Sequence, residues 1–511
     1  MTMRRLLIGL AALAALVAAS PAPSRAADPK PLRVAMNADP DVLDMTQSTN
    51  PPQGLATMSN VYESLLRPTP DGHAEPLLAE SWDILDGGKT IVMHLRHGVK
   101  FHSGDAFTAA DVVWSHERMA KKTWFYALSF AKFITRVEAV DPYTVKFSFK
   151  QPDALFLQVP ALIIGSKSYF ERVGEKDFGK HANGTGPYKV VDYRPAEYLD
   201  LTRFDDYWGK KPQVKDAHFV FVQDDNTRVA KLQAGEVDLI MATPYSAYDQ
   251  LKGQGYNLVK LPVHPTQSIQ MQLSNPTSPW HDLRIRKAMA HAIDRDAIVK
   301  GLLHGLPTDY PRLMPDEIGY DPNLVDYKYD PAKARALAAE AGYPNGFTMP
   351  LYYSTGVYFG TVETAEAVAL YLKQNLNVTS KVEGIQLIKL LQMLGRIARD
   401  PKGEYVGVAG LPIANLPTPL EGVALAYSGM FAMYKNDKLD ALLAKADSIL
   451  DVKQQEPLIR DMMKIEQDDL STITLWQYVD VYAMKKGVEY APSRHGLEVV
   501  FLPQVTVSGA K

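Results

Sequence analysis

The most informative segment of the sequence, residues 78–112, reads LAESWDILDGGKTIVMHLRHGVKFHSGDAFTAADV. Within it, residues 89–96 alternate apolar and polar side chains, and this period of two predicts a β-strand. Residues 143–150 alternate in the same way and predict a second strand. We expect turns at Gly98 and Gly104, because glycine accepts backbone angles that other residues avoid. We expect core side chains at Trp82, Val99 and Phe101.

Outside this segment, the apolar period changes between that of a strand and that of a helix. Residues 31–36 predict a first strand, and 283–300 and 362–375 predict helices with one apolar face. A further helix is predicted to begin at Asp330, as the N-cap before Pro331, and to end at Gly342. Mixed strands and helices throughout indicate an α/β architecture.

Length and composition limit the possible functions. The chain has 511 residues, 46% of them hydrophobic and 22% charged, which is typical of a folded globular protein. Because single hydrophobic cores stop growing near ~250–300 residues, we expect at least two lobes. A net charge of −3 gives no basic field for nucleic acid. The absence of cysteine excludes disulfides, thiolate catalysis, Cys-ligated zinc, iron–sulfur clusters and a lipid-modified N-terminal Cys.

The first 26 residues have the composition of a signal peptide. Arg4 and Arg5 precede 14 apolar or glycine residues, and Ser24-Arg25-Ala26 places small residues at a cleavage site. Fourteen helical residues would cover about 21 Å, which is short of a ~30 Å hydrocarbon core. We therefore expect cleavage after residue 26 and a chain that diffuses freely in a bacterial periplasm, without a lipid anchor.

Motifs for catalysis or metal binding are weak. The sequence has no G-x-S-x-G, H-E-x-x-H or G-x-G-x-x-G. Residues 174–181 resemble a phosphate-binding loop, but His181 replaces the magnesium-binding hydroxyl and two acids would repel phosphate. His94 and His97 lie three apart on a predicted strand and so face opposite ways. We predict no catalytic residue, no metal site and no cofactor.

Several motifs occur together and in one order along the chain. They are LAESW (78–82), DGGKT (86–90), LRHGVKFHSG (95–104), TAADV (108–112), GTGPY (184–188), LQAGEVD (232–238), DLRIRKA (282–288), YDP (329–331) and AGYP (341–344). This set resembles the signature of the bacterial extracytoplasmic solute-binding proteins of family 5, the receptors of the dipeptide, oligopeptide and nickel ABC importers. The motifs identify a fold and leave the ligand open.

The resemblance implies a bilobal periplasmic-binding-protein-like fold of type II, with an extra subdomain inserted in lobe I. Lobe I would comprise residues 30–58, 184–276 and 477–511, the inserted subdomain 59–183 and lobe II 277–476. Such a receptor closes on a small-molecule ligand and delivers it to an ABC permease and its ATPase. Monomers are usual among similar receptors, so we expect a monomer. From the net charge we expect no nucleic-acid partner.

The resemblance also indicates where a ligand would lie. In similar proteins the loop after the first strand contacts the ligand, and here it offers Asn37, Asp39 and Asp41; capping of a turn explains these residues equally well. Aromatic residues of the inserted subdomain often cover the ligand, at the place of Trp124, Phe125 and Tyr126. Tyr353 and Ser354 follow a predicted strand of lobe II, where open α/β sheets favour ligands. Gln386 is a further candidate, since the family often has a tryptophan or an acid nearby.

Residues 405–419, YVGVAGLPIANLPTP, depart from the family pattern. Peptide-binding relatives usually carry Gly-Trp here and then a carboxylate that holds the peptide α-ammonium. This chain has Gly410 and Leu411, then Asn415, and no acid before Glu421. Burying an ammonium without a charged partner costs on the order of ~3–5 kcal/mol. We therefore expect a peptide-like, neutral or aromatic solute without a free α-ammonium at this point.

Three other functions remain open on the sequence. A nickel or metal-chelate receptor of the same family is one, with His264 and His495 as possible cleft residues. A periplasmic hydrolase on the same scaffold is another, although no nucleophile beside a base is evident. A signalling or chaperone-like binder that uses the same lobes without a permease is the third.

Overall fold

The computed structural model describes residues 30–37, 39–40, 42–47, 58–69, 71–122, 126, 131–158, 162–307, 313–324, 327–355, 360–399, 407–409, 420, 433–493 and 500–508. The predicted signal peptide lies outside these residues. Pro31–Lys511 forms one compact unit, and everything below concerns this unit.

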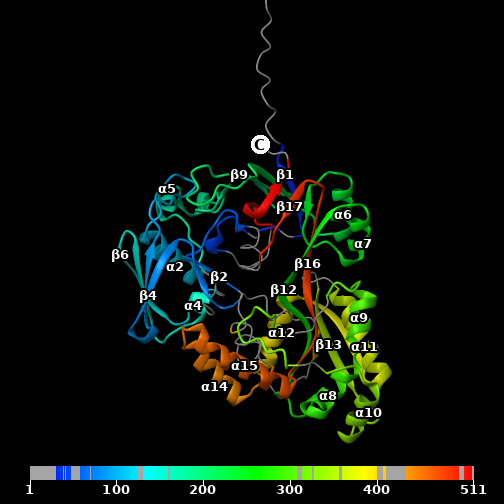
Figure 1. Ribbon diagram of the computed structural model, residues 1–511. Coiled ribbons are helices and arrows are strands. Elements are labelled where there is room, and N and C mark those ends of the chain that lie inside the picture. The colour runs from blue at the N-terminus through cyan, green and yellow to red at the C-terminus, as the bar shows by residue number, and fades with distance from the viewer. Residues whose placement is uncertain are drawn as a thin grey trace, which may run out of the picture. The chain divides into compact units, whose positions relative to one another are not determined.

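Within the described residues, ten strands form one mixed sheet (Figure 1). In spatial order the strands are β14 (Thr379–Gln386), β13 (Thr348–Thr355), β15 (Gly407–Ala409), β12 (Asn257–Met271), β16 (Thr472–Met484), β11 (Leu239–Ile240), β1 (Leu32–Met36), β10 (Asp216–Phe221), β9 (Tyr198–Arg203) and β8 (Tyr188–Arg194). The long strands β12 and β16 pair with each other in the middle of this order.

A second sheet carries the informative segment. Its strands in order are β4 (Ala79–Leu85), β5 (Thr90–Leu95), β7 (Thr144–Phe149) and β6 (Ile134–Asp141). The predicted alternation is confirmed, because Ile91, Met93 and Leu95 of β5 are at most 1% exposed. Gly98 and Gly104 have the positive φ angles expected of turn glycines. Two-stranded sheets join β2 (Leu66–Pro68) to β3 (Ala74–Pro76) and β17 (Val488–Tyr490) to β18 (Val505–Val507).

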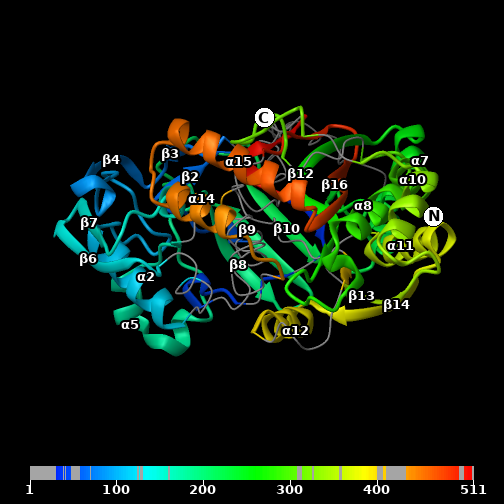
Figure 2. The same ribbon diagram turned by 90° about the horizontal axis from the view of Figure 1, so that it is seen from below.

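Helices surround these sheets (Figures 1 and 2). Their bounds are α2 (Ala109–Lys122), α4 (Leu155–Gln158), α5 (Lys167–Phe178), α6 (Asp225–Gln233), α7 (Tyr248–Gly253), α8 (Leu283–Ala292), α9 (Arg295–Leu302), α10 (Pro331–Glu340), α11 (Thr361–Leu376), α12 (Leu387–Arg399), α14 (Asp437–Asp447) and α15 (Val452–Asp469). None of the helices in this part of the chain combines the length and the apolar composition that a membrane crossing needs.

The helix predictions are confirmed except at one point. Asp330 caps α10 by accepting a hydrogen bond from Lys333 N, with Pro331 in the first turn. One continuous helix over 283–300 is wrong. Ile293 is extended, with φ −101° and ψ 118°, and the Asp294 side chain accepts a hydrogen bond from Ala297 N, so that α9 begins anew.

Two main hydrophobic cores lie along the sheet. The first takes side chains from β1, β8, β9, β10 and the four-stranded sheet, and the second takes side chains from β13, α8, α9, α10, α11, α14 and α15. Strand β16 supplies both, with Tyr478 and Tyr482 in the first core and Leu475 and Trp476 in the second. The β12–β16 pair therefore runs through both cores.

The GTGPY motif has a local structural reason. An added Cβ would lie 2.1 Å from Val61 O at Gly184 and 2.7 Å from Val61 C at Gly186, so only glycine fits at either position. Between them, the Thr185 hydroxyl donates a 2.8 Å hydrogen bond to the buried carboxyl of Glu63. Burial raises the pKa of this Glu63 carboxyl. The motif thus joins two segments that are far apart in sequence.

Candidate functional site

The strand register brings two groups of strand ends to face each other. Strands β1 and β11 are parallel to each other, and β11 runs antiparallel to β16, so both point toward the lower-numbered end of β16. Strands β13 and β14 are parallel to β15, which runs antiparallel to β12 and hence parallel to β16. The carboxyl ends of the two groups therefore point at each other along the middle of the β12–β16 pair.

The separation of the two groups follows from the register. On the first side, Thr243 N, three residues after β11, donates to Val481 O at 2.9 Å. On the second side, Tyr353 of β13 is level with Ile269 of β12, because both pair with Ala409 of β15. Strand β13 then continues toward the level of the Gln267–Trp476 pair. From Trp476 to Val481 is five residues of strand, or roughly 17 Å at ~3.3 Å per residue. Ligands of open α/β sheets bind beyond the carboxyl ends of strands, so this is the candidate site.

The loop after β1 begins on one side of this region. Asn37 directly follows the strand and is half-buried. The Asp39 carboxylate accepts a 2.8 Å hydrogen bond from Ala196 N, which ties the loop to the turn between β8 and β9. Asp41, predicted with them, lies outside the described residues.

The other side carries the predicted residues of β13 and β14. Tyr353 and Ser354 lie inside β13 near its carboxyl end, so the prediction that they follow the strand is wrong; Ser354 is 1% exposed. The exposed Gln386 is the last residue of β14. Tyr353 pairs with Gly384, and an added Cβ at Gly384 would lie 2.8 Å from the Tyr353 ring. Gly384 thus leaves room for this ring. The topology brings Asn37, Tyr353, Ser354 and Gln386 to the same region of the sheet.

The described part of the structure does not place the remaining predicted residues at the candidate site. Tyr126 is 3% exposed, belongs to the first core and has its hydroxyl 3.0 Å from His116 Nδ1. Trp124, Phe125, Gly410, Leu411 and Asn415 lie outside the described residues. Their role in the site therefore stays a prediction.

Sequence reasoning missed a polar group on the strand pair itself. Gln267 and Trp476 are cross-strand partners, 1% and 0% exposed, and the Tyr478 hydroxyl donates a hydrogen bond to Gln267 Oε1. Within the described part of the chain, Gln267 Nε2 and Trp476 Nε1 are buried without a hydrogen-bond acceptor. No local motif marks these residues, because the pairing depends on a register across about 200 residues.

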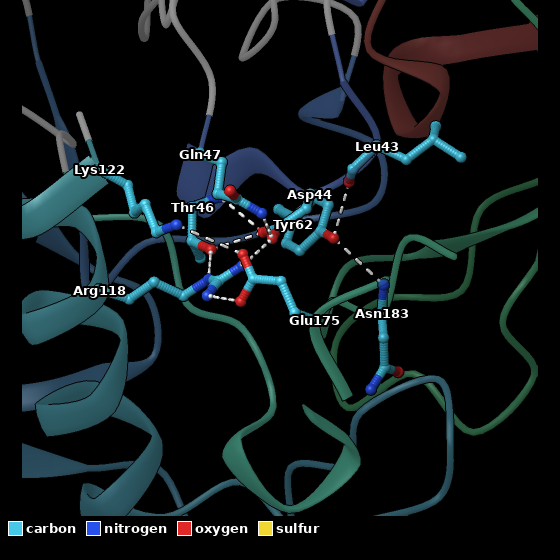
Figure 3. Close-up of polar contacts among 9 residues, drawn as sticks. All are labelled: Leu43, Asp44, Thr46, Gln47, Tyr62, Arg118, Lys122, Glu175 and Asn183. Atoms are coloured by element: carbon cyan, nitrogen blue, oxygen red, sulfur yellow. Dashed lines mark hydrogen bonds and ion pairs between the residues drawn. The ribbon is translucent and has the colours of Figure 1, made fainter. Parts of the chain in front are cut away.

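A buried ion-pair cluster fixes the loop after β1 to the four-stranded sheet's helices (Figure 3). From α2, Arg118 Nη2 contacts Asp44 Oδ2 at 2.7 Å, and Arg118 Nε donates to Thr46 Oγ1 at 2.7 Å. From α5, Glu175 contacts Arg118 Nη1 at 2.8 Å, and this hydrogen bond lowers the pKa of the Glu175 carboxyl. Tyr62 adds a hydrogen bond to Leu43 O. The cluster holds residues 43–47, directly after the predicted ligand loop.

The alternative sites of the sequence take structural roles. Residues 174–178, the start of the phosphate-loop-like segment, belong to α5 as the structure has it, and Glu175 pairs with Arg118. His94 contacts Asp83 at 2.9 Å on the four-stranded sheet. Among the described residues, no group of three or more histidines, aspartates and glutamates could hold a metal ion. The side chain of His264 and the whole of His495 lie outside the described residues.

A hollow of about 670 Å³ lies at the far end of the strand pair. Its lining is polar and consists of Gln233, Gln250, Gln254, Gly255, Tyr256, Lys485 and Lys486. These residues follow β16 or precede β12, away from the facing carboxyl ends. The hollow is therefore separate from the candidate site.

Comparison with known proteins identifies relatives of this chain. The glutathione-binding protein GsiB of Salmonella paratyphi A is 33% identical over 327 residues, which are 63% of this chain and 62% of that relative. The glutathione-binding protein GsiB of Pectobacterium atrosepticum is 31% identical over 405 residues, covering 75% of this chain and 76% of that relative. The chain thus spans less than two thirds of the Salmonella relative's length.

Solved structures and a family model agree with these relatives. The periplasmic binding protein DppA of Helicobacter pylori, in complex with the peptide STSA, superposes with a TM-score of 0.76 at 25% identity, covering 94% of this chain and 98% of that one. The described unit accordingly has the bilobal α/β fold of periplasmic binding proteins. The model of the bacterial extracellular solute-binding proteins, family 5 Middle, matches residues 73–402. The chain belongs to family 5 of the bacterial extracellular solute-binding proteins.

Proposed function

We propose that the chain is the substrate-binding protein of a bacterial ABC importer. It would capture a small solute between its two lobes and deliver it to a membrane permease driven by an ATPase. The observation that carries this proposal is the facing of two groups of strand ends across the middle of β12 and β16. A solute held there contacts both cores, so its binding favours the closed arrangement.

We further propose that the protein acts without breaking bonds, as a monomer in the periplasm, after removal of residues 1–26 and without a lipid anchor. Family members are periplasmic receptors of small solutes, and membership supports this assignment. The lobes are assigned as residues 30–58, 184–276 and 477–511 for lobe I, 59–183 for its inserted subdomain and 277–476 for lobe II.

The solute we propose is peptide-like or a neutral or aromatic compound. Similarity to proteins named as glutathione-binding and to a peptide-bound DppA supports a peptide-like size. The lack of an acid between Gly410 and Glu421 argues against recognition of a free α-ammonium there.

Native mass spectrometry of protein purified from its own periplasm tests the receptor role, because a co-purified solute would name the ligand class. Calorimetry then compares glutathione, dipeptides and their N-acetylated forms. We expect N-acetylation to leave affinity unchanged within about threefold. Tight binding that requires the free amine would refute the proposed solute class, and no bound solute together with no titratable binding would refute the receptor role.

Among the described residues, the nickel-chelate alternative has no group of three or more histidines, aspartates and glutamates behind it. Nickel with L-histidine belongs in the same calorimetric panel, and micromolar binding of it would replace the organic solute in this proposal.

A further inference from the structure

A second contact joins the proposed lobes away from the large sheet. Ala154 N, just before α4, donates to Asp447 O at the end of α14 at 2.8 Å. Gln158 Nε2 at the end of α4 donates to Gln455 Oε1 of α15 at 2.7 Å, and both side chains are buried. Leu155 of α4 belongs to the second core, whereas Leu157 belongs to the first. We call the contact of residues 152–158 with α14 and α15 the clasp.

The clasp is closely packed. An added Cβ at Gly88 would lie 3.0 Å from Leu450, which follows α14, and 3.0 Å from Pro152. Leu450 packs against both hydrophobic cores. In the turn between β2 and β3, which belong to the proposed inserted subdomain, an added Cβ at Gly72 would lie 3.5 Å from Val452 of α15. The two proposed lobes therefore touch on this side as well as through β12 and β16.

Two carboxyl groups and one ammonium group lie inside the clasp. Asp153 is 1% exposed, and the Asp447 side chain is 13% exposed. Lys132 Nζ, from the loop before β6, lies 3.7 Å from Asp447 Oδ2. Both oxygens of Asp153 and Oδ1 of Asp447 are buried without a well-formed hydrogen bond among the described residues. Lys132 thus pairs with Asp447, and the charges of both act on the carboxyl group of Asp153.

The protonation of this pair follows from its surroundings. Burial, and secondarily the charge of Asp447, raise the pKa of the Asp153 carboxyl to about 7, while Lys132 and the N–H groups of Leu155 and Phe156 act in the opposite direction. Burial also raises the pKa of Asp447, against the attraction of Lys132. Asp451, the N-cap of α15, is a further acid near the clasp; it is exposed and accepts hydrogen bonds from Lys453 N and Gln454 Nε2.

We propose that the clasp is a proton-dependent latch between the two lobes, which holds them together more strongly in acidic than in neutral surroundings and so slows the release of the solute. The latch rests on the two-lobe function proposed above. A proton on Asp153 removes the repulsion between the two carboxylates, and one remaining negative charge is balanced by Lys132. Loss of that proton leaves two buried anions facing one cation.

The direction and size of the pH effect on closure follow from the linkage between proton binding and lobe closure. When the lobes separate, Asp153 returns to water and to an ordinary pKa of 3.8, so the closed arrangement binds the extra proton. The ratio of closed to open molecules then rises as the pH falls below about 7. Between pH 8.5 and pH 5.5 the expected rise is roughly thirtyfold.

The experiment uses spin labels on the solute-free, full-length mature protein. The chain has no cysteine, so Val140→Cys and Lys435→Cys give two specific labels. Val140 is 60% exposed and the Lys435 side chain is 76% exposed, the former on the inserted subdomain and the latter just before α14. Double electron–electron resonance at a series of pH values then measures the closed and open populations.

Asp153→Asn keeps the shape and removes the titrating group, and we expect it to abolish the pH dependence. Asp437→Asn is the matched control, because it removes the same charge from an exposed position on α14, the helix across the clasp, where the side chain is 92% exposed, and it should retain the wild-type dependence. Lys132→Met should lower the closed population at pH 8.5, which tests the latch even if Asp153→Asn fails to fold. A wild-type ratio that does not change with pH, or an unchanged pH dependence in Asp153→Asn, overturns the latch. Since no solute is used, these outcomes are independent of the receptor role.

Discussion

Replacing Arg118 with methionine removes the cation of the cluster in Figure 3 and keeps an unbranched side chain of similar length. Asp44 is 1% exposed, so the substitution leaves a buried carboxylate without its cation. Breaking a buried pair in this way costs about 3–5 kcal/mol of unfolding free energy. Glu175, whose side chain is 50% exposed, adds little, because water screens it. The Thr46 and Gln47 donors that remain on Asp44 place the expected loss near the lower end.

Thermal unfolding at pH 7 measures this loss. For a compact unit of residues 31–511, the unfolding entropy near the midpoint is about 1 kcal/mol/K, so a loss of ~3–4 kcal/mol lowers Tm by roughly 3–4 °C. Arg172→Met is the matched control: its side chain is 52% exposed and pairs with Asp105, so Tm should fall by less than about 1 °C.

A double-mutant cycle separates the ion pair from packing. Asp44→Asn removes the other charge, and the double variant no longer contains an unpaired buried ion, so we expect a coupling energy of at least about 2 kcal/mol between the two sites. Strictly additive effects, or an Arg118→Met variant no less stable than the Arg172→Met control, would refute the reasoning.

Three further predictions concern other parts of the unit. Gly186→Ala should lower the free energy of unfolding, measured by chemical denaturation, by about 3 kcal/mol, because its Cβ would lie 2.7 Å from the backbone of residue 61. The control Gly253→Ala has open space around its Cβ and should change that free energy by under ~1 kcal/mol. Burial raises the pKa of Glu317 to about 8, so its contribution to the free energy of unfolding is lost as the pH rises from 4.5 through 8. The free energy of unfolding should therefore decline by about 4 kcal/mol over that range, and Glu317→Gln should flatten this decline. A urea-midpoint profile that Glu317→Gln leaves unchanged would contradict the prediction. Gln386→Ala should weaken solute binding, measured by calorimetry, by about tenfold without changing Tm. Lys381→Ala, toward the opposite end of β14, is the control and should leave the affinity unchanged. Equal affinities of the wild-type protein and Gln386→Ala would remove Gln386 from the site.

Much of the fold is encoded in local patterns. The alternation of β5 and the capping residues Asp330 and Gly342 act over a few residues, so they can be recognised without tertiary information. The break between α8 and α9 escaped prediction because the apolar period continues through Asp294, and only the backbone turn at Ile293 reveals the new cap.

The site is only partly readable in this way. Asn37 and Gln386 could be proposed because strand ends are general ligand positions, and the register brings both toward one region. Gln267 and Trp476 could not, since their pairing is set by two strands that are adjacent only after the chain between them has folded. The Arg118–Asp44 pair escaped prediction for the same reason, since its members are 74 positions apart in the sequence.

If the two lobes open and close as proposed, the β12–β16 pair has to hold the two cores together and also allow them to move. Its ladder is irregular between Pro262 and Thr266 and again between Gln267 and Ser268, which is the stretch between the two groups of strand ends. Pro262 and Pro265 have no N–H to give to a ladder, and a bulge leaves a residue unpaired, so bending costs less here than in the regular parts of the strands. A hinge at this place would move the two groups of strand ends toward or away from each other, around a solute held between them.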